Sequence, residues 1–144
     1  MNFQKAHAKV NMYLAVGKAS QNFHPIESLF CLIELSDELT FKKSPSGFDL
    51  KVSGPYAKDL KGKNLLERIW EDLSGSMPEI SGIEISLKKN IPVCGGLGGG
   101  SSDAAAFLRY LHLNFHPFGD IKELFKYAYD LGKDIPFFLT GWSA

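Results

Sequence analysis

Polar and apolar residues alternate over residues 9–16, which is the pattern of a strand with two different faces. One face carries Val10, Met12, Leu14 and Val16, and the other carries Lys9, Asn11 and Tyr13. Lys9 and Asn11 are therefore expected to point the same way. Four further short segments rich in Phe, Ile, Val or Leu are predicted strands, namely residues 28–35, 38–42, 48–52 and 83–88.

Helical spacing is found between and after these strands. Apolar residues recur at intervals of three and four over residues 65–73, which predicts a helix with Asn64 as its N-cap. A second helix is predicted after Asp120, because Asp120 and Glu123 have the spacing of a capping box and Gly132 supplies a stop. Strands and helices follow one another without regular βαβ alternation, which favours an α+β sandwich.

A run of small residues leads into another predicted helix, which begins near Asp103. Its members are Gly95, Gly96, Leu97, Gly98, Gly99, Gly100, Ser101 and Ser102. Glycines leave the backbone free to bring several N–H groups against one ligand, and the start of the helix adds unpaired donors and a positive dipole end. The run therefore predicts a phosphate-binding loop.

Two common nucleotide motifs do not fit this run. A Walker loop requires a lysine before the Ser/Thr, yet Ser101 follows Gly100 directly. A dinucleotide motif that starts at Gly96 meets Ser101 where its third small residue should be. A flexible linker is the remaining alternative, and the ordered elements on both sides favour a structured loop instead.

Composition narrows the classes of partner. The chain has 144 residues, 44% of them hydrophobic, which is enough for the core of one domain. Sixteen basic residues balance sixteen acidic ones, so we expect neither nucleic acid nor an anionic membrane as a partner. Two cysteines are too few for a disulfide framework. No signal peptide or apolar span is visible, so we expect a cytoplasmic protein.

Three segments together resemble the GHMP kinases, the family of galactokinase, homoserine kinase and mevalonate kinase. Residues 91–105 resemble the family's ATP phosphate-binding motif, and residues 8–14 and 131–138 are similar to two further segments of one branch. That branch phosphorylates a cytidine diphosphate derivative of methylerythritol. The resemblance implies a fold like ribosomal protein S5 domain 2. It also implies that residues 1–144 are the N-terminal ATP-binding domain, without the C-terminal GHMP domain.

The resemblance assigns catalytic roles to two residues. Lys9 would lie beside the phosphoryl acceptor and stabilise charge on the transferring group. Asp134 would face the acceptor hydroxyl as general base or positioning group. The structural alternatives are a solvated strand lysine and a turn-forming aspartate.

The resemblance also implies that ATP and Mg²⁺ bind at the glycine-rich loop. The implied ATP-binding residues are Asn64, Lys89, Pro92, Gly95, Gly96, Leu97, Gly98, Gly99, Gly100, Ser101 and Ser102. A serine hydroxyl would lie near the metal, and no dedicated metal site of carboxylates is predicted. For Asn64 the alternative is a helix N-cap. Lys89 and its neighbour Lys88 precede the loop, and their structural alternative is a charge pair on an edge strand. Asp103 is interpreted as a solvated first-turn acid without a catalytic role.

Asn11, Phe23 and His24 are the expected contacts to the acceptor substrate. The branch has a Gly-Tyr-His run where this chain has Asn22, Phe23 and His24, so stacking on a base is kept and a phenol hydroxyl is lost. Pro25 and His7 also differ from the residues usual in that branch. Another GHMP small-molecule kinase and a nucleotide-binding fragment without turnover therefore stay open as alternatives. His112 and His116 have helical metal spacing but no third ligand nearby.

Overall fold

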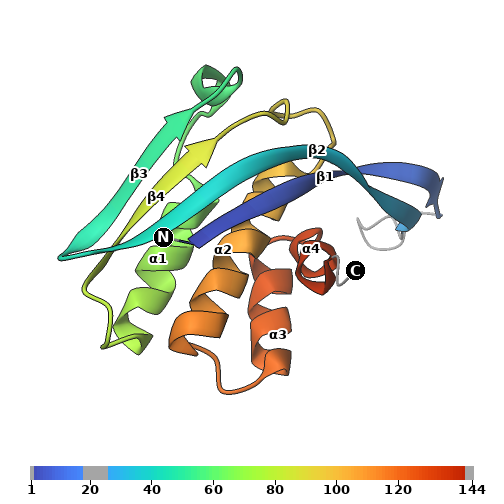
Figure 1. The fold of residues 1–144 in the computed structure, drawn as a ribbon. Helices are drawn as coiled ribbons and strands as arrows, with labels where there is room; N and C mark the ends of the chain where they lie inside the picture. The colour runs from blue at the N-terminus through green and yellow to red at the C-terminus, as the bar shows by residue number, and fades with distance from the viewer. Residues whose placement is uncertain (1, 18–25, 142–144) are drawn as a thin grey trace.

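The computed structural model describes residues 2–17 and 26–141, which form a sheet with helices packed against one face (Figure 1). The strands are β1 (Asn2–Val16), β2 (Ile26–Ser44), β3 (Gly47–Ser53) and β4 (Gly82–Lys88). The α-helices are α1 (Leu65–Leu73), α2 (Gly99–Phe115), α3 (Ile121–Leu131) and α4 (Ile135–Thr140). The predicted α+β class is confirmed.

The sheet has the order β1-β2-β4-β3 in the described part of the chain. β1 pairs with β2 and β2 with β4 in antiparallel fashion, whereas β3 and β4 are parallel. A parallel pair needs a crossover connection, and α1 supplies it between β3 and β4. β4 lies between β2 and β3, so the structural alternative for Lys88 and Lys89, an edge-strand charge pair, is wrong.

The core lies between the sheet and α2, with α1 beside it. Phe41 on β2 stacks on Phe107 and Tyr110 of α2, with ring centroids 5.5 and 4.4 Å apart. Three successive alanines of α2, residues 104–106, are fully buried, and their small side chains let the helix approach the strands closely. The core thus holds the start of α2 in a fixed position against the sheet.

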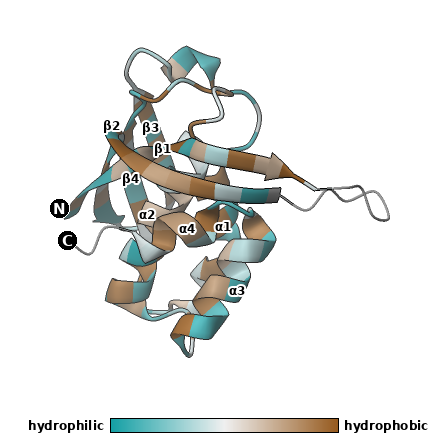
Figure 2. Ribbon diagram, turned by 90° about the vertical axis from the view of Figure 1, so that its right-hand side faces the viewer, coloured by the Kyte–Doolittle hydropathy of each residue, from teal (hydrophilic) through white to brown (hydrophobic). Residues whose placement is uncertain are grey.

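The first two strands continue past the helices as a two-stranded arm, which we define as residues 11–16 and 27–31 (Figures 1 and 2). Met12, Leu14 and Val16 are more than half exposed there, while Ala6 and Ala8 are fully buried. The alternation correctly predicted a strand, but its apolar face does not meet the core. Register shifts between residues 7 and 9 and between residues 11 and 13 change which side chains face inward.

β2 is one continuous strand where the sequence predicted two. The two predicted strands are separated by Ser36 and Asp37, which lie inside β2. The Asp37 side chain is fully buried and has hydrogen-bond partners, so the strand passes through this position without a turn.

The predicted helix caps are present. Asn64 accepts a hydrogen bond from the Leu66 amide at 2.9 Å, and Asp120 accepts one from the Glu123 amide at 2.9 Å. The Glu123 carboxylate accepts from the Gly119 amide rather than from Asp120, so the capping box is displaced by one residue. None of the helices in the described ranges is long and apolar enough to cross a membrane.

Candidate active site

The glycine-rich loop runs from the end of β4 to the start of α2. Gly96 and Gly98 have φ values of +70° and +72°, in the left-handed region that favours glycine. A Cβ atom at Gly98 would lie 2.7 Å from the Phe138 ring and 3.2 Å from the Lys9 side chain. Gly98 is therefore required both by its backbone conformation and by the close approach of α4 and β1.

α2 begins at Gly99, several residues earlier than predicted, so the run itself forms the first helical turn. The Ser102 amide donates to the Gly98 carbonyl at 2.9 Å and starts the helical ladder. The amides of Gly99, Gly100 and Ser101 precede that bond and have no acceptor inside the helix. With the helix dipole they form a site suited to an anion.

A cavity of about 270 Å³ lies against this turn. It is lined by Leu60, Leu65, Lys89, Pro92, Val93, Cys94 and residues 95–101. Nine of the eleven residues expected to bind ATP are therefore gathered around one space. The other two lie elsewhere: Asn64 lines a neighbouring cavity of about 170 Å³ with Gly100 and Asp103, and Ser102 is buried beside a third cavity.

Lys9 joins strand β1 to this loop. Its backbone amide donates to the Leu97 carbonyl at 2.9 Å, and its buried ammonium group donates to the Asn11 carboxamide oxygen at 2.8 Å. The ammonium also lies 4.3 Å from the centre of the Phe30 ring, a cation–π contact. The predicted shared orientation of Lys9 and Asn11 is confirmed.

Asp134 faces Lys9 from the beginning of α4. The Lys9 ammonium nitrogen and the Asp134 carboxylate oxygen are 3.7 Å apart. Asp134 occupies the N-cap position of α4, but its side chain makes no capping hydrogen bond and is 39% exposed. The carboxylate is thus open to a ligand on one side and paired with a cation on the other.

A buried ion cluster of Lys89, Asp37 and Asp103 lies beneath the loop. The Lys89 ammonium pairs with the Asp37 carboxylate and lies 2.9 Å from that of Asp103. The second oxygen of Asp37 accepts the amides of Asn90 and Ile91 at 2.6 and 2.9 Å. The cluster therefore ties the start of the loop to β2 and to the first turns of α2.

Asp103 is nearly fully buried, so the expectation that it is solvated is wrong. Burial raises the pKa of its carboxyl to about 7, although the charge of Lys89 opposes that shift. Its second oxygen, Oδ1, is buried without a hydrogen-bond partner. The two carboxylates in turn raise the pKa of Lys89 against the opposing effect of its burial. Sequence reasoning missed this cluster, because Asp37, Lys89 and Asp103 are far apart in the chain and only the fold brings both carboxylates to Lys89.

Phe23 and His24 lie outside the described residues. Asn11, the third expected substrate contact, begins the arm and accepts a hydrogen bond from the Lys9 ammonium.

In the described ranges, no group of three or more His, Cys, Asp or Glu residues is arranged to hold a metal ion. His112 and His116 pack ring against ring, 5.9 Å between centroids.

The family model of the GHMP kinases N terminal domain matches residues 64–141, which include the glycine-rich loop and Asp134. The chain therefore belongs to the GHMP kinase family.

Two similar relatives are 4-diphosphocytidyl-2-C-methyl-D-erythritol kinases. Those of Thermotoga maritima and Thermotoga petrophila are 42% and 41% identical over 140 residues, which is 96% of this chain and 49% of each relative. The chain thus spans about half the length of these relatives.

A solved structure of 4-(cytidine 5'-diphospho)-2C-methyl-D-erythritol kinase aligns with 97% of this chain and 49% of its own, at a TM-score of 0.79 and 37% identity. A homoserine kinase from Cytophaga hutchinsonii aligns with 71% of this chain and 33% of its own, at a TM-score of 0.51. At 21% identity, this second likeness shows the fold alone.

Proposed function

We propose that this chain is the ATP-binding part of a kinase that transfers the γ-phosphoryl group of ATP to the 2-hydroxyl of 4-diphosphocytidyl-2-C-methyl-D-erythritol. The reaction belongs to the non-mevalonate supply of isoprenoid precursors. The observation that carries the proposal is the convergence of Lys9 and Asp134, 3.7 Å apart, beside Gly98 at the phosphate loop. The names of the similar relatives support the choice of acceptor.

ATP would bind with its phosphates against the first turn of α2. The unpaired amides of Gly99, Gly100 and Ser101 would donate to phosphate oxygens, and Gly100 has open space where a side chain would stand. Mg²⁺ would be held mainly by the phosphates, with the Ser101 hydroxyl at the edge of the cavity as a fitting oxygen ligand. Bound there, the metal ion would neutralise phosphate charge.

Lys9 and Asp134 would act on the acceptor hydroxyl and the transferring group. The hydroxyl oxygen attacks the γ-phosphorus, the bond to the β-phosphate oxygen breaks, and ADP leaves. Asp134 would orient the hydroxyl and accept its proton, while Lys9 would stabilise the negative charge on the phosphoryl oxygens. The hydrogen bond from Lys9 to Asn11 and its backbone bond to Leu97 support a fixed position for this cation.

Asn11, Phe23 and His24 would contact the acceptor, with Phe23 stacked on its cytosine. We further propose that residues 1–144 form one domain of a longer, cytoplasmic protein whose second domain closes the acceptor pocket. Ligand sites are favoured at such domain interfaces, where water is excluded.

An acceptor panel tests the proposed function. The protein that carries this chain at the full length of its relatives would be given γ-labelled ATP with the cytidyl substrate, homoserine, galactose or mevalonate. We expect label on the cytidyl substrate in large excess over the others. Preference for another acceptor would make the protein a different GHMP kinase, and the absence of any transfer would favour a nucleotide-binding protein without turnover.

A substitution at Phe23 tests the cytosine contact separately. Phe23→Ala should weaken binding of the cytidyl substrate by about 1 to 3 kcal/mol, the usual contribution of one base stacked on an aromatic ring. Phe3→Ala, an exposed phenylalanine at the far end of β1, is the matched control. Equal acceptor affinities in the Phe23 variant and the wild type would remove Phe23 from the substrate site.

A further inference from the structure

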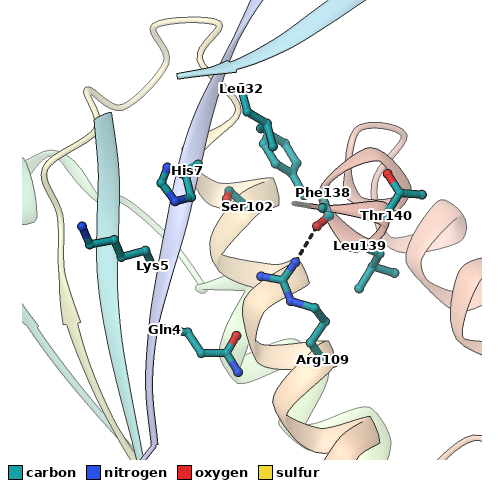
Figure 3. A pocket seen from close by; sticks show the side chains of 10 residues that line it. Gln4, Lys5, His7, Leu32, Ser102, Arg109, Phe138, Leu139 and Thr140 are labelled. Carbon is teal, nitrogen blue, oxygen red and sulfur yellow. Dashed lines mark hydrogen bonds between the residues drawn. The ribbon is translucent and has the colours of Figure 1, made fainter. Parts of the chain in front are cut away.

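A second and larger cavity, of about 500 Å³, opens between β1, α2 and α4 (Figure 3). Its volume is within the range of small-molecule sites. It is lined by Gln4, Lys5, His7, Leu32, Ser102, Arg109 and residues 138–141, and none of these is acidic. The reaction proposed above does not use this space.

Arg109 supplies the positive charge of the cavity. One nitrogen of its guanidinium donates to the Phe138 carbonyl at 2.7 Å, at the end of α4. No carboxylate of the described residues lies within salt-bridge distance of it. Burial lowers the pKa of Arg109, and no acidic neighbour offsets this. Arg109 is partly buried, and charged groups withdrawn from water are usually paired, so its guanidinium is suited to accept an anionic partner from the cavity.

Polar groups surround the guanidinium on the cavity side. Figure 3 shows Gln4 on β1 pointing toward the same space as Arg109, with Ser102 at the start of α2 and Thr140 on α4 around it. The ammonium of Lys5 points away from Arg109 in this view. The Thr140 hydroxyl already donates to the Phe137 carbonyl at 2.6 Å, so the Gln4 amide and the Arg109 fork are the donors considered for a ligand. Such donors suit oxygen atoms of a carboxylate or phosphate group, which arginine binds through two parallel hydrogen bonds.

Phe138 separates this cavity from the phosphate loop. Its ring packs at the Gly98 position of the loop, whereas its carbonyl accepts from Arg109. The loop amides of residues 99–101 border the other cavity. The two spaces therefore present separate sets of donors to their ligands.

We propose that the cavity around Arg109 is a second anion-binding site, distinct from the phosphate loop, for a small ligand that carries a phosphate or carboxylate group. Arg109 binds the anionic group through the face of its fork that is free of Phe138. Gln4 adds an amide donor to the polar wall, and Leu32 and Leu139 contact the apolar part of the ligand. This inference does not depend on the identity of the kinase substrate.

Titrations of the ¹⁵N-labelled protein, at the full length of its relatives, with inorganic phosphate and, separately, with succinate test the proposal. We expect saturable shifts at Gln4, Thr140 and the Arg109 Nε–H signal, with the phosphate loop responding as a separate set with its own affinity. Stronger binding of one probe identifies the class of anion. Shifts confined to the loop, or no saturable response at the cavity with either probe, would overturn the proposal.

Variants of Arg109 locate the binding group. Arg109→Gln should weaken binding at the cavity at least tenfold and by a larger factor than it weakens binding at the loop. Arg109→Lys should bind at the cavity with an affinity between those of Arg109→Gln and the wild type, because it keeps the charge and loses the fork. Lys122→Gln on α3 removes the same charge from an exposed position and should bind as the wild type does. If Arg109→Gln does not fold, Gln4→Leu decides. A threefold or greater loss of anion affinity at the cavity in Gln4→Leu supports the site, and an unchanged affinity overturns it.

Discussion

At the scale of single residues, the chain places its charged side chains around the loop in two different ways. Lys9 and Asp134 form a pair with one member open to solvent, as groups that meet a ligand must be. Lys89, Asp37 and Asp103 are buried and contact one another and the backbone. We therefore interpret Lys9 and Asp134 as the pair that acts on the substrate, and the buried cluster as a structural support for the loop.

The raised pKa of Asp103 makes the stability of the protein depend on pH. The folded state holds a proton up to about pH 7, whereas the unfolded chain releases it near the ordinary value of 3.8. Between these values the folded state binds more protons, so stability falls as pH rises and levels off above 7. Each unit of pKa difference corresponds to about 1.4 kcal/mol.

Urea unfolding of the wild type and Asp103→Asn at pH 5 and pH 8 measures this effect. The wild type should lose more stability between the two pH values than the variant does. Asp130→Asn, at an exposed position near the end of α3, is the control and should keep the wild-type pH dependence. Parallel pH profiles for wild type and Asp103→Asn would show that Asp103 does not titrate in this range.

At the scale of elements, the short helix α4 fixes the site from one side and the loop from the other. Asp134 stands at its beginning, Phe138 packs on Gly98, and Arg109 holds its last turn through the Phe138 carbonyl. Because α4 contacts the loop through Phe138, a change at Gly98 acts on both. The packing of Phe138 on Gly98 thus links the position of the loop to that of the Asp134 carboxylate.

Gly98→Val tests that contact. The substitution forces a β-branched residue into a left-handed conformation and against the Phe138 ring, so we expect loss of measurable ATP binding by calorimetry. Gly100→Ala is the control, because its Cβ would stand in open space. Its free energy of unfolding should lie within about 1 kcal/mol of that of the wild type. That result would show that the loop accepts a side chain at another position. Wild-type ATP affinity in Gly98→Val would contradict the assignment of this loop.

The sequence predicted the structural features that depend only on neighbouring residues. The N-caps at Asn64 and Asp120 and the helix after the glycine run are examples, because each depends on residues within one turn. The burial of Asp103 and Lys89 could not be predicted in this way, because each is neutralised by partners that only the folded sheet brings near. The exposed apolar face of residues 12–16 also escaped prediction, since period-two alternation does not say what covers a face.

At the scale of the whole molecule, the arm leaves apolar side chains uncovered. Met12, Tyr13, Leu14, Val16 and Leu29 are each more than half exposed. Several large apolar side chains exposed on one segment are typical of a contact with another domain or molecule. The relatives are about twice as long as this chain, which supports a role for the arm at a domain boundary.

The 144-residue chain should therefore self-associate, and it should have a small fraction of the turnover of the protein at the full length of its relatives. Sedimentation at rising concentration should show oligomers of the wild type. The double variant Met12→Lys, Leu14→Lys should remain monomeric. Leu113→Lys, at an exposed leucine of α2, is the control and should not change association. Full turnover from a monomeric 144-residue chain would show that no second domain is needed to close the pocket.

The most direct test of the account is the turnover of Lys9→Ala, Asp134→Asn and the double variant in the full-length protein. Each single variant should lower kcat about 10²- to 10³-fold, the usual cost of one stabilising group at a reacting centre, and change the KM for ATP little. The double variant should lose far less than the product of the two, because the groups act as a unit. Lys122→Ala and Asp130→Asn, exposed on α3, are the matched controls. A kcat near that of the wild type in either single variant would contradict the site described here.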